Sequence, residues 1–368
     1  MYIPFLPLNR KQSSKQNQVD ESKFKYFKLG RHAMCAGIDH MKLDKNKFVL
    51  MPSSICMAAI EPFIEKGIKI SHYSIDENMN WDIKEIESKI SDDISSVYVV
   101  HYFGIRSDTR ELANICQKKN KILIEDFALS GFSLELAETI FSDIAIFSLW
   151  KFHPMPDGAM LYINKSNPFS INLPDDHFFN ICKLRLKILI KKYFARYSVL
   201  SYLLNIIKKE RNSLDDKSNR FENLNLKICS ISKHSKNIFL QEDLNRVHSI
   251  RINNFKSYTN FFKENKIYCL YENIDNNSIP YCFPIIFEKV NDLKKMLQND
   301  GIETEISVNP PFKDSRYVNS NNCINEEVLK LSQTVLSLPL HQDLSIQDIK
   351  YIQNCVVKNI EIIRNDYN

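Results

Sequence analysis

The most informative stretch of this sequence is SDIAIFSLWKFHPMPDGAML, residues 142–161. It contains an apolar run that ends at Ser148, and Lys151 follows three residues later. The upstream stretch ILIEDFALS, residues 122–130, has a similar form, because an apolar run leads into Asp126. Short apolar runs that end in polar residues are typical of strands buried on both faces of a parallel sheet.

Strand-like and helix-like segments alternate through the first half of the chain. The patterns predict strands at 48–51, 68–71, 96–101, 122–125 and 144–148, with helices at 29–39, 56–66, 81–91 and 108–119. This alternation predicts an α/β fold in which helices sandwich a mostly parallel sheet. Ligands of such sheets bind outside the carboxyl ends of the strands. The polar residues that follow strand ends here are Ser53, His101, Asp126, Ser148 and Lys151.

The second half of the chain has a different pattern. Helices are expected at 241–263, 291–298 and 346–364, and strands at 266–271, 281–287 and 336–340. These segments predict a smaller α+β domain. The chain is therefore expected to consist of an N-terminal arm (1–29), a large domain (30–215) and a small C-terminal domain (216–368).

Composition limits the classes of protein to consider. Of the 368 residues, 49 are Lys or Arg and 44 are Asp or Glu, which gives a formal net charge of +5. This mild excess suits an anionic small molecule. The sequence has no compact basic stripe and no zinc-finger spacing, so neither nucleic acid nor a bound metal is expected. Nine cysteines without CxxC spacing are typical of reduced thiols in a cytoplasmic protein.

No membrane segment is expected. The N-terminus lacks the pattern of a signal peptide, and the chain has no run of about 18 uncharged apolar residues. The segment 177–211 is basic and has apolar residues at helical spacing. It is expected to pack on the body of the protein or on a partner subunit, with an interfacial membrane helix as the alternative.

One set of residues in the first half matches what an enzyme needs to use pyridoxal phosphate. Such an enzyme needs a lysine for the cofactor aldehyde, an acidic residue for the pyridine nitrogen, and N–H groups or hydroxyls for the phosphate. The run GRH at 30–32 opens a predicted helix, where free N–H groups suit a phosphate. Asp126 and Ser148 end apolar strands, and Lys151 lies on the turn that follows Ser148.

Taken together, these segments resemble the DegT/StrS-type sugar aminotransferases, a family of fold-type I pyridoxal-phosphate enzymes with the aspartate-aminotransferase fold. The similarity covers nearly the whole chain outside 165–235. It is carried, in order, by LGRHAM (29–34), VLMPSSICMAAIEPFIEKGIKISHYSID (49–76), VVHYFG (99–104), ILIEDFALS (122–130), SDIAIFSLWKFHPMPDGAML (142–161) and VLSLPLHQDLSIQDI (335–349).

The resemblance implies a role for each residue of the candidate site. Lys151 would form the internal aldimine with pyridoxal 5'-phosphate and act as the catalytic residue. Asp126 would pair with the pyridinium nitrogen, and Ser148 would contact the phosphate. The phosphate would also be held at a helix start by Gly30, Arg31 and His32.

The resemblance also implies an activity. The protein would be a cytoplasmic aminotransferase that converts a nucleotide-linked keto-sugar to an amino-sugar, for surface polysaccharides or antibiotics. An amino donor such as glutamate would supply the nitrogen. A homodimer is implied, because the active sites of the family lie at the subunit interface.

Departures from the family pattern leave two alternatives open. Leu129 stands where most members have Gln or His, Cys56 stands where an aromatic residue packs on the cofactor ring, and the family's Gly-Tyr-Asn-x-Arg stretch has no clear counterpart near 230–237. One alternative is therefore a catalytically degenerate protein that binds the cofactor or a sugar. Counting five residues from Ser148, as in many relatives, gives His153. The other alternative is a sugar dehydratase with His153 as the base.

Overall fold

The computed structural model describes residues 3–9, 13, 16–164, 226–275, 277–308 and 325–366. A seven-stranded sheet lies at its centre, in the order β1-β7-β6-β5-β4-β2-β3. Its strands are β1 (Phe24–Phe27), β2 (Phe48–Pro52), β3 (Lys69–Tyr73), β4 (Ile94–Val100), β5 (Ile122–Phe127), β6 (Ile144–Phe147) and β7 (Ala159–Ile163). Strands β2 to β6 pair in parallel, whereas β7 and β1 run antiparallel to their neighbours. The predicted α/β class with a mostly parallel sheet is therefore confirmed.

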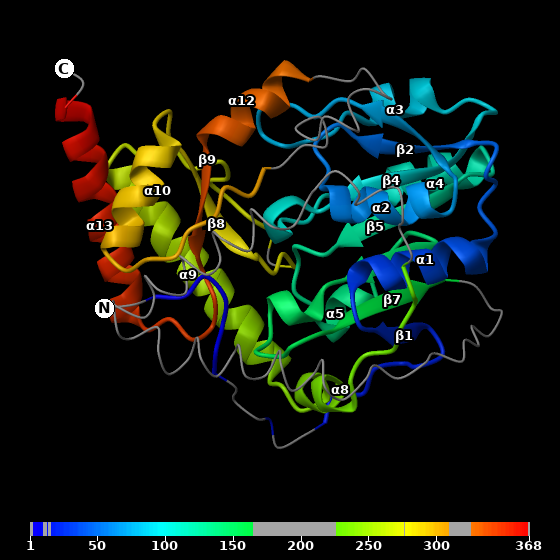
Figure 1. The fold of residues 1–368 in the computed structure, drawn as a ribbon, viewed down its shortest axis with the longest axis horizontal. Coiled ribbons are helices and arrows are strands. Elements are labelled where there is room, and N and C mark those ends of the chain that lie inside the picture. The colour runs from blue at the N-terminus through cyan, green and yellow to red at the C-terminus, as the bar shows by residue number, and fades with distance from the viewer. Residues whose placement is uncertain are drawn as a thin grey trace.

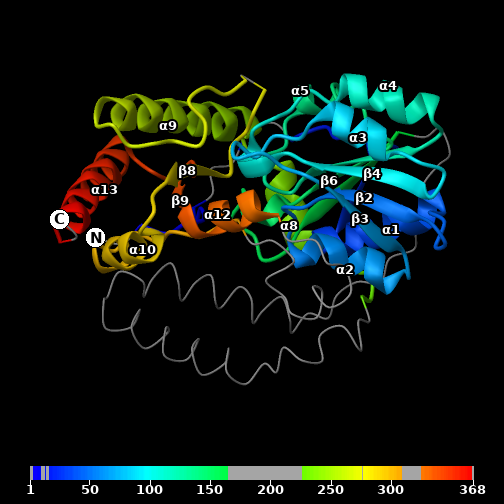
Figure 2. The ribbon, with the colours of Figure 1, turned by 90° about the horizontal axis from the view of Figure 1, so that it is seen from above.

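Helices cover both faces of this sheet (Figure 2). Helices α1 (Gly30–Met41) and α2 (Met57–Glu65) lie on one face, and α3 (Ile83–Lys89) and α4 (Arg110–Lys118) lie on the other. Small residues let α1 approach the strands closely, since a Cβ on Gly37 would lie 3.3 Å from Leu161 of β7. The layers bury one large apolar cluster around the central strands.

A second unit packs beside the carboxyl ends of the strands (Figure 1). It contains a two-stranded antiparallel sheet of β8 (Cys282–Ile286) and β9 (Val335–Pro339). The helices α9 (Leu244–Glu264), α10 (Val290–Asn299), α12 (Glu326–Thr334) and α13 (Ile346–Asp366) accompany it. A separate apolar cluster forms between these strands and the helices α9, α10 and α13.

The structure differs from the sequence expectations in several elements. Residues 24–27, expected in the arm, form β1 and pair with β7, a strand that the pattern did not predict. The strand expected at 266–271 is reduced to an isolated bridge between Cys269 and Ile285. Helix α8 (Lys233–Leu240), which was also not expected, packs its apolar side against β1 and β6 residues. The proposed domain limits stay a prediction.

The segment 177–211 lies outside the described residues. None of the helices in the described ranges has both the length and the apolar character needed to cross a bilayer.

Candidate active site

Asp126 is the penultimate residue of β5, and its carboxylate is held by two donors. The hydroxyl of Tyr98 donates to Oδ2 at 2.7 Å, and the backbone N–H of Ala128 donates to Oδ1 at 2.7 Å. Because β4 pairs with β5 in a register that sets Val100 opposite Asp126, Tyr98 projects from the same face of the sheet as Asp126. Burial, followed by the charge of Asp126, raises the pKa of Tyr98 well above its ordinary value. Tyr98 therefore acts as a fixed donor that orients the carboxylate.

Lys151 follows the neighbouring strand. Strand β6 ends at Phe147, and Ser148 begins the 3₁₀ turn η2 (Leu149–Lys151). The side chain of Lys151 is half-buried, and its Nζ lies 5.5 Å from the ring centroid of Tyr281. A parallel sheet brings the ends of β5 and β6 to the same edge, so Asp126 and Lys151 both lie there.

Cys56 lies close enough to both residues for their charges to act on its thiol. Burial raises the pKa of the Cys56 thiol, the charge of Lys151 lowers it, and the charge of Asp126 raises it again. Cys56 is nevertheless exposed to solvent. A side chain that reaches solvent but is desolvated by surrounding protein lies in a recess, so Asp126, Lys151 and Cys56 mark one recess at the sheet edge.

The start of α1 lies beside this edge. A Cβ on Gly30 would lie 3.8 Å from Ile146, two residues before Ser148. The N-cap residue Leu29 supplies no side-chain acceptor to the helix. The first N–H groups of a helix have no partners within it, and here they lie close to the end of β6.

The side chains of the two residues after Gly30 are directed to other partners. Nη1 of Arg31 pairs with Oε2 of Glu61 on α2 at 2.8 Å. Nδ1 of His32 accepts the backbone N–H of Cys229 at 3.3 Å. The backbone N–H groups of His32 and Ala33 donate to the Leu29 carbonyl at 3.0 and 3.1 Å. The N–H groups of Gly30 and Arg31 are therefore the donors of this turn best suited to an anion.

His101 and its surroundings belong to a structural network. Nε2 of His101 lies 3.2 Å from Glu125, and its ring stacks on Phe127 with centroids 4.1 Å apart. Glu125 also accepts bonds from the Thr109 hydroxyl and the Ser142 N–H. Burial alone would raise the pKa of Glu125, but these donors and His101 hold it below its ordinary value. Glu125 is on the opposite face of β5 from Asp126.

His153 and His341 are also turned away from the recess. His153 is buried, with Nδ1 3.7 Å from Glu242 and its ring 5.6 Å from that of Phe239. Nε2 of His341 lies 2.9 Å from the carbonyl oxygen of Pro4. Burial lowers the pKa of His341 to about 3, so this imidazole is neutral and donates to that carbonyl.

Two residues of the recess were not anticipated from the sequence, namely Tyr98 and Tyr281. Tyr98 lies inside β4. The alternation of side chains along β4, combined with the pairing of β4 with β5, would have placed Tyr98 beside Asp126. Tyr281 precedes β8, more than a hundred residues from Lys151 in the sequence. No local pattern predicts that contact, because it depends on how the second unit packs against the sheet.

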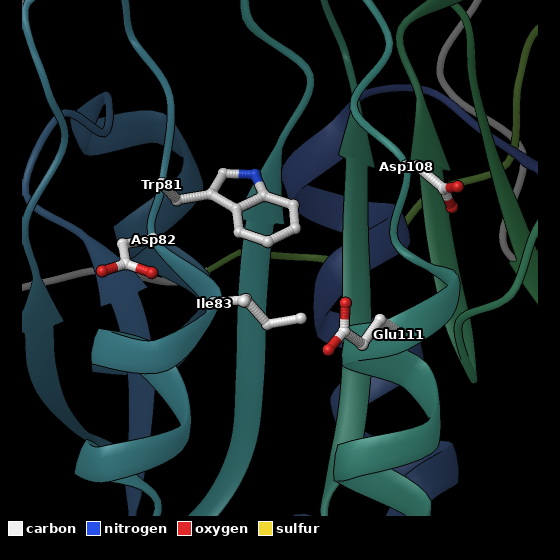
Figure 3. A pocket seen from close by; sticks show the side chains of 5 residues that line it. All are labelled: Trp81, Asp82, Ile83, Asp108 and Glu111. Carbon is white, nitrogen blue, oxygen red and sulfur yellow. The ribbon is translucent and has the colours of Figure 1, made fainter.

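A separate hollow of about 370 Å³ lies between the starts of α3 and α4 (Figure 3). Its lining consists of Trp81, Asp82, Ile83, Asp108 and Glu111. The carboxylates around it disfavour a phosphate or nucleotide, and none of the predicted site residues lines it. Among the described residues, no group of three or more His, Cys, Asp or Glu side chains is arranged to hold a metal ion.

The chain is similar in sequence to known proteins. The model of the DegT/DnrJ/EryC1/StrS aminotransferase family matches residues 28–162 and 240–357. The UDP-4-amino-4,6-dideoxy-N-acetyl-beta-L-altrosamine transaminase of Campylobacter jejuni subsp. jejuni serotype O:23/36 (strain 81-176) is 23% identical over 338 residues, which cover 88% of this chain and 82% of that protein.

Solved structures share the fold. Helicobacter pylori PseC, an aminotransferase involved in the biosynthesis of pseudoaminic acid, has a TM-score of 0.66 at 16% identity, covering 95% of this chain and 93% of that chain. The E. coli GDP-4-keto-6-deoxy-D-mannose-3-dehydratase with bound hydrated PLP has a TM-score of 0.65 at 16% identity, covering 90% and 87%. Since an aminotransferase and a dehydratase match equally well, the fold alone does not distinguish the two reactions.

Proposed function

Because the chain belongs to the DegT/DnrJ/EryC1/StrS aminotransferase family, we propose that it transfers an amino group to a nucleotide-linked keto-sugar with pyridoxal 5'-phosphate as its cofactor. The observation that carries this proposal is that Asp126 and Lys151 lie at the carboxyl ends of the neighbouring strands β5 and β6 and that the charges of both act on the Cys56 thiol. A carboxylate and an amine in this relation are what the cofactor requires.

The residues of the recess fit the cofactor. The Asp126 carboxylate, oriented by Tyr98 and Ala128, would hold the pyridine nitrogen. The N–H groups of Gly30 and Arg31 at the start of α1 and the hydroxyl of Ser148 would take the phosphate. Lys151 would bind the cofactor aldehyde through Nζ. When bound, the cofactor supplies an electron sink that stabilises negative charge on the carbon next to the transferred nitrogen.

The chain's own residues would then position and move protons. The Asp126 carboxylate would hold a proton on the ring nitrogen, because a negative charge beside that nitrogen favours its protonated form. The Nζ of Lys151 would act as the general base and acid that moves the proton of the amino donor's carbon. Tyr281 forms one wall of the space in which Nζ moves.

The acceptor class is extended from the relatives. The Campylobacter jejuni protein is by its name a transaminase of a UDP-linked amino-sugar, and we assign a nucleotide-linked keto-sugar to this chain by analogy. Glutamate is the proposed donor. The net charge of +5 is compatible with such an anionic acceptor.

Compartment and assembly are proposed in the same way. The cysteines within the described ranges are all free thiols, which supports a reducing compartment such as the cytoplasm. A homodimer is proposed from the family's arrangement of active sites, and the mass of the particle in solution tests it.

The dehydratase alternative depends on His153. The described contacts of this residue are with Glu242 and Phe239, under α8, rather than with Asp126 or Cys56. This placement supports Lys151 over His153 as the residue that faces the cofactor. The degenerate alternative depends on Leu129 and Cys56, whereas Asp126 and Lys151 are both present.

An absorbance experiment tests the proposal. Purified protein with pyridoxal phosphate should show a visible band that Lys151→Ala abolishes and that glutamate bleaches in the parent. Lys121→Ala is the matched control, because Lys121 lies before β5 at the opposite end of the strand and donates to Ile94. Adding a nucleotide-linked keto-sugar to the bleached parent should restore the band. A parent without the band would favour the degenerate alternative, and a band that persists in Lys151→Ala would remove Lys151 from this role.

A further inference from the structure

Arg251 of α9 is completely buried, at 0% exposure. Its Nη1 donates to the carbonyl oxygens of Pro280 at 2.9 Å and Tyr281 at 3.0 Å, and its Nε donates to Oε1 of Gln342 at 3.1 Å. Within the described part of the chain, these acceptors are backbone carbonyls and an amide oxygen rather than a carboxylate. Burial lowers the pKa of Arg251 to about 10, so the guanidinium still carries its charge at neutral pH.

Gln342 links this guanidinium to the lysine turn, which is η2 with the following residue Phe152. The residue follows β9 and is 3% exposed. While Oε1 accepts from Arg251, Nε2 donates to the carbonyl oxygen of Phe152 at 2.7 Å. A guanidinium can only donate and a carbonyl can only accept, so both partners require this orientation of the amide.

Phe152 completes the connection. Its ring lies 4.6 Å from the guanidinium carbon of Arg251 and 5.9 Å from the ring of Tyr281. Phe152 directly follows Lys151, whose Nζ lies over Tyr281. The two segments that meet at the lysine, 151–152 and 280–281, are therefore both tied to Arg251 and Gln342.

We propose that Arg251 and Gln342 are positioning residues that set where the amine of Lys151 lies in the recess. This inference rests on the proposed role of Lys151. The pair acts through two chains of contact, from Gln342 to the Phe152 carbonyl and from Arg251 to the backbone that carries the Tyr281 ring.

The energetic character of the pair supports this role. A buried charge is costly, and apolar residues of similar size would stabilise a core at least as well. A guanidinium fork instead fixes the relative position of several acceptors at once, which a lysine cannot do. Small displacements of a reacting group can cost orders of magnitude in rate, so a device that fixes the lysine turn has a functional consequence.

The test compares Gln342→Glu with Gln353→Glu. Gln342→Glu keeps an oxygen for Arg251 but removes the donor that the Phe152 carbonyl uses. Gln353 of α13 is the matched control: it is 4% exposed, and its Nε2 donates to the Ser257 carbonyl at 3.0 Å. Gln342→Met, which lacks both polar atoms, provides a second, neutral variant in case Gln342→Glu does not fold.

Three quantities are measured on the full-length parent and on each variant. The first is the pH at which the visible band of the bound cofactor changes. The second is the split of kcat and KM for the glutamate half-reaction. The third is the acetylation rate of Lys151 in cofactor-free protein, measured by mass spectrometry against Lys236. Gln342→Met leaves unchanged the ionisable groups near Lys151, namely Asp126, Cys56, Tyr281 and Cys282, whereas Gln342→Glu adds a carboxylate. A pH shift that both variants share is therefore the one that reports the position of the lysine.

We expect Gln342→Glu and Gln342→Met to lower kcat about tenfold or more with a smaller change in KM, and to shift both the pH midpoint and the acetylation rate. Gln353→Glu should leave these three readouts at parent values. If the Gln342 variants behave like Gln353→Glu, the inference is wrong. Borohydride reduction of the parent loaded with pyridoxal phosphate separates a failure of the proposed function from a failure of this inference. If the cofactor is not trapped on Lys151, the proposed function and this inference are both wrong. If it is trapped but the Gln342 variants are unshifted, only this inference is wrong.

Discussion

The bond between Tyr98 and Asp126 gives the most direct measurement of how the site is held. Tyr98 is 1% exposed, and Tyr98→Phe removes only the hydroxyl that donates to Asp126 at 2.7 Å. A hydrogen bond to a charged group contributes about 1.5–3 kcal/mol to stability. We therefore expect the variant to lose a free energy of unfolding in this range.

Tyr73→Phe is the matched control. Tyr73 is also 1% exposed and belongs to the same apolar cluster, but its hydroxyl donates to a neutral acceptor, the backbone carbonyl of Tyr98, at 2.9 Å. A bond of this kind contributes about 0.5–1.5 kcal/mol. The two variants make the same chemical change in the same core, so their difference, about 1 kcal/mol, reports the charge on Asp126.

Urea unfolding of the cofactor-free proteins at neutral pH measures the loss of unfolding free energy in each variant. The dependence of that free energy on urea concentration should be the same in both variants, which shows that the same unit unfolds. Tyr98→Phe should also release pyridoxal phosphate faster on dialysis, because the Asp126 carboxylate loses one of its two described donors. Equal losses of stability in the two variants would refute the view that Tyr98 donates to an ionised carboxylate.

Three further predictions concern pH, backbone and cofactor. The pKa of His341 is about 3 in the folded chain and about 6.5 in the unfolded chain, so between these pH values only the unfolded state binds the proton. The free energy of unfolding therefore falls as the pH drops from 6.5 toward 3. In urea titrations, His341→Gln should remove about 2 kcal/mol of the stability that the parent loses between pH 7 and pH 5. Gly104 has φ +83° and a Cβ there would lie 2.3 Å from the Leu129 carbonyl oxygen, whereas Gly67, at φ +72°, has open space around it. Thermal melts should show that Gly104→Ala is far more destabilising than Gly67→Ala, which should cost about 1–2 kcal/mol. Similar losses in the two variants would contradict the close approach at Gly104. Cys56→Phe should retain pyridoxal phosphate about fivefold more tightly, because a ring contact is worth about 1 kcal/mol, and unchanged retention on dialysis would show that residue 56 does not face the cofactor.

Much of the sheet could be predicted because its central strands are locally distinctive. The runs that became β4, β5 and β6 are apolar on both faces, as burial between two helical layers requires. The strands β1 and β7 were missed, although β7 is fully buried. Strand β1 follows a polar segment that indicated an arm, and β7 follows a proline-rich turn. Neither strand therefore has the flanking signals of an alternating β-α unit.

The candidate site was predictable only in part. Asp126 is the penultimate residue of β5 and Ser148 directly follows β6, so both lie at strand ends as expected. The family match confirms the resemblance from which their roles were taken. The choice between Lys151 and His153 could not be made by counting from Ser148, because it depends on how the short η2 turn directs each side chain. The structure turns His153 toward Glu242 and Lys151 toward Tyr281, which supports the choice of Lys151 while its chemical role stays a proposal.

The sequence by itself determined the class of fold and the order of the polar residues along it. Both follow from local periodicity, since side chains alternate in strands and ligands meet the ends of parallel strands. Only the tertiary structure decided which groups touch those residues. Arg31 pairs with Glu61, Tyr98 reaches Asp126, and Arg251 with Gln342 ties the lysine turn to the second unit. These contacts join residues far apart in the chain, and burial makes each of them a requirement, because a polar group removed from water must find a partner wherever the fold brings one.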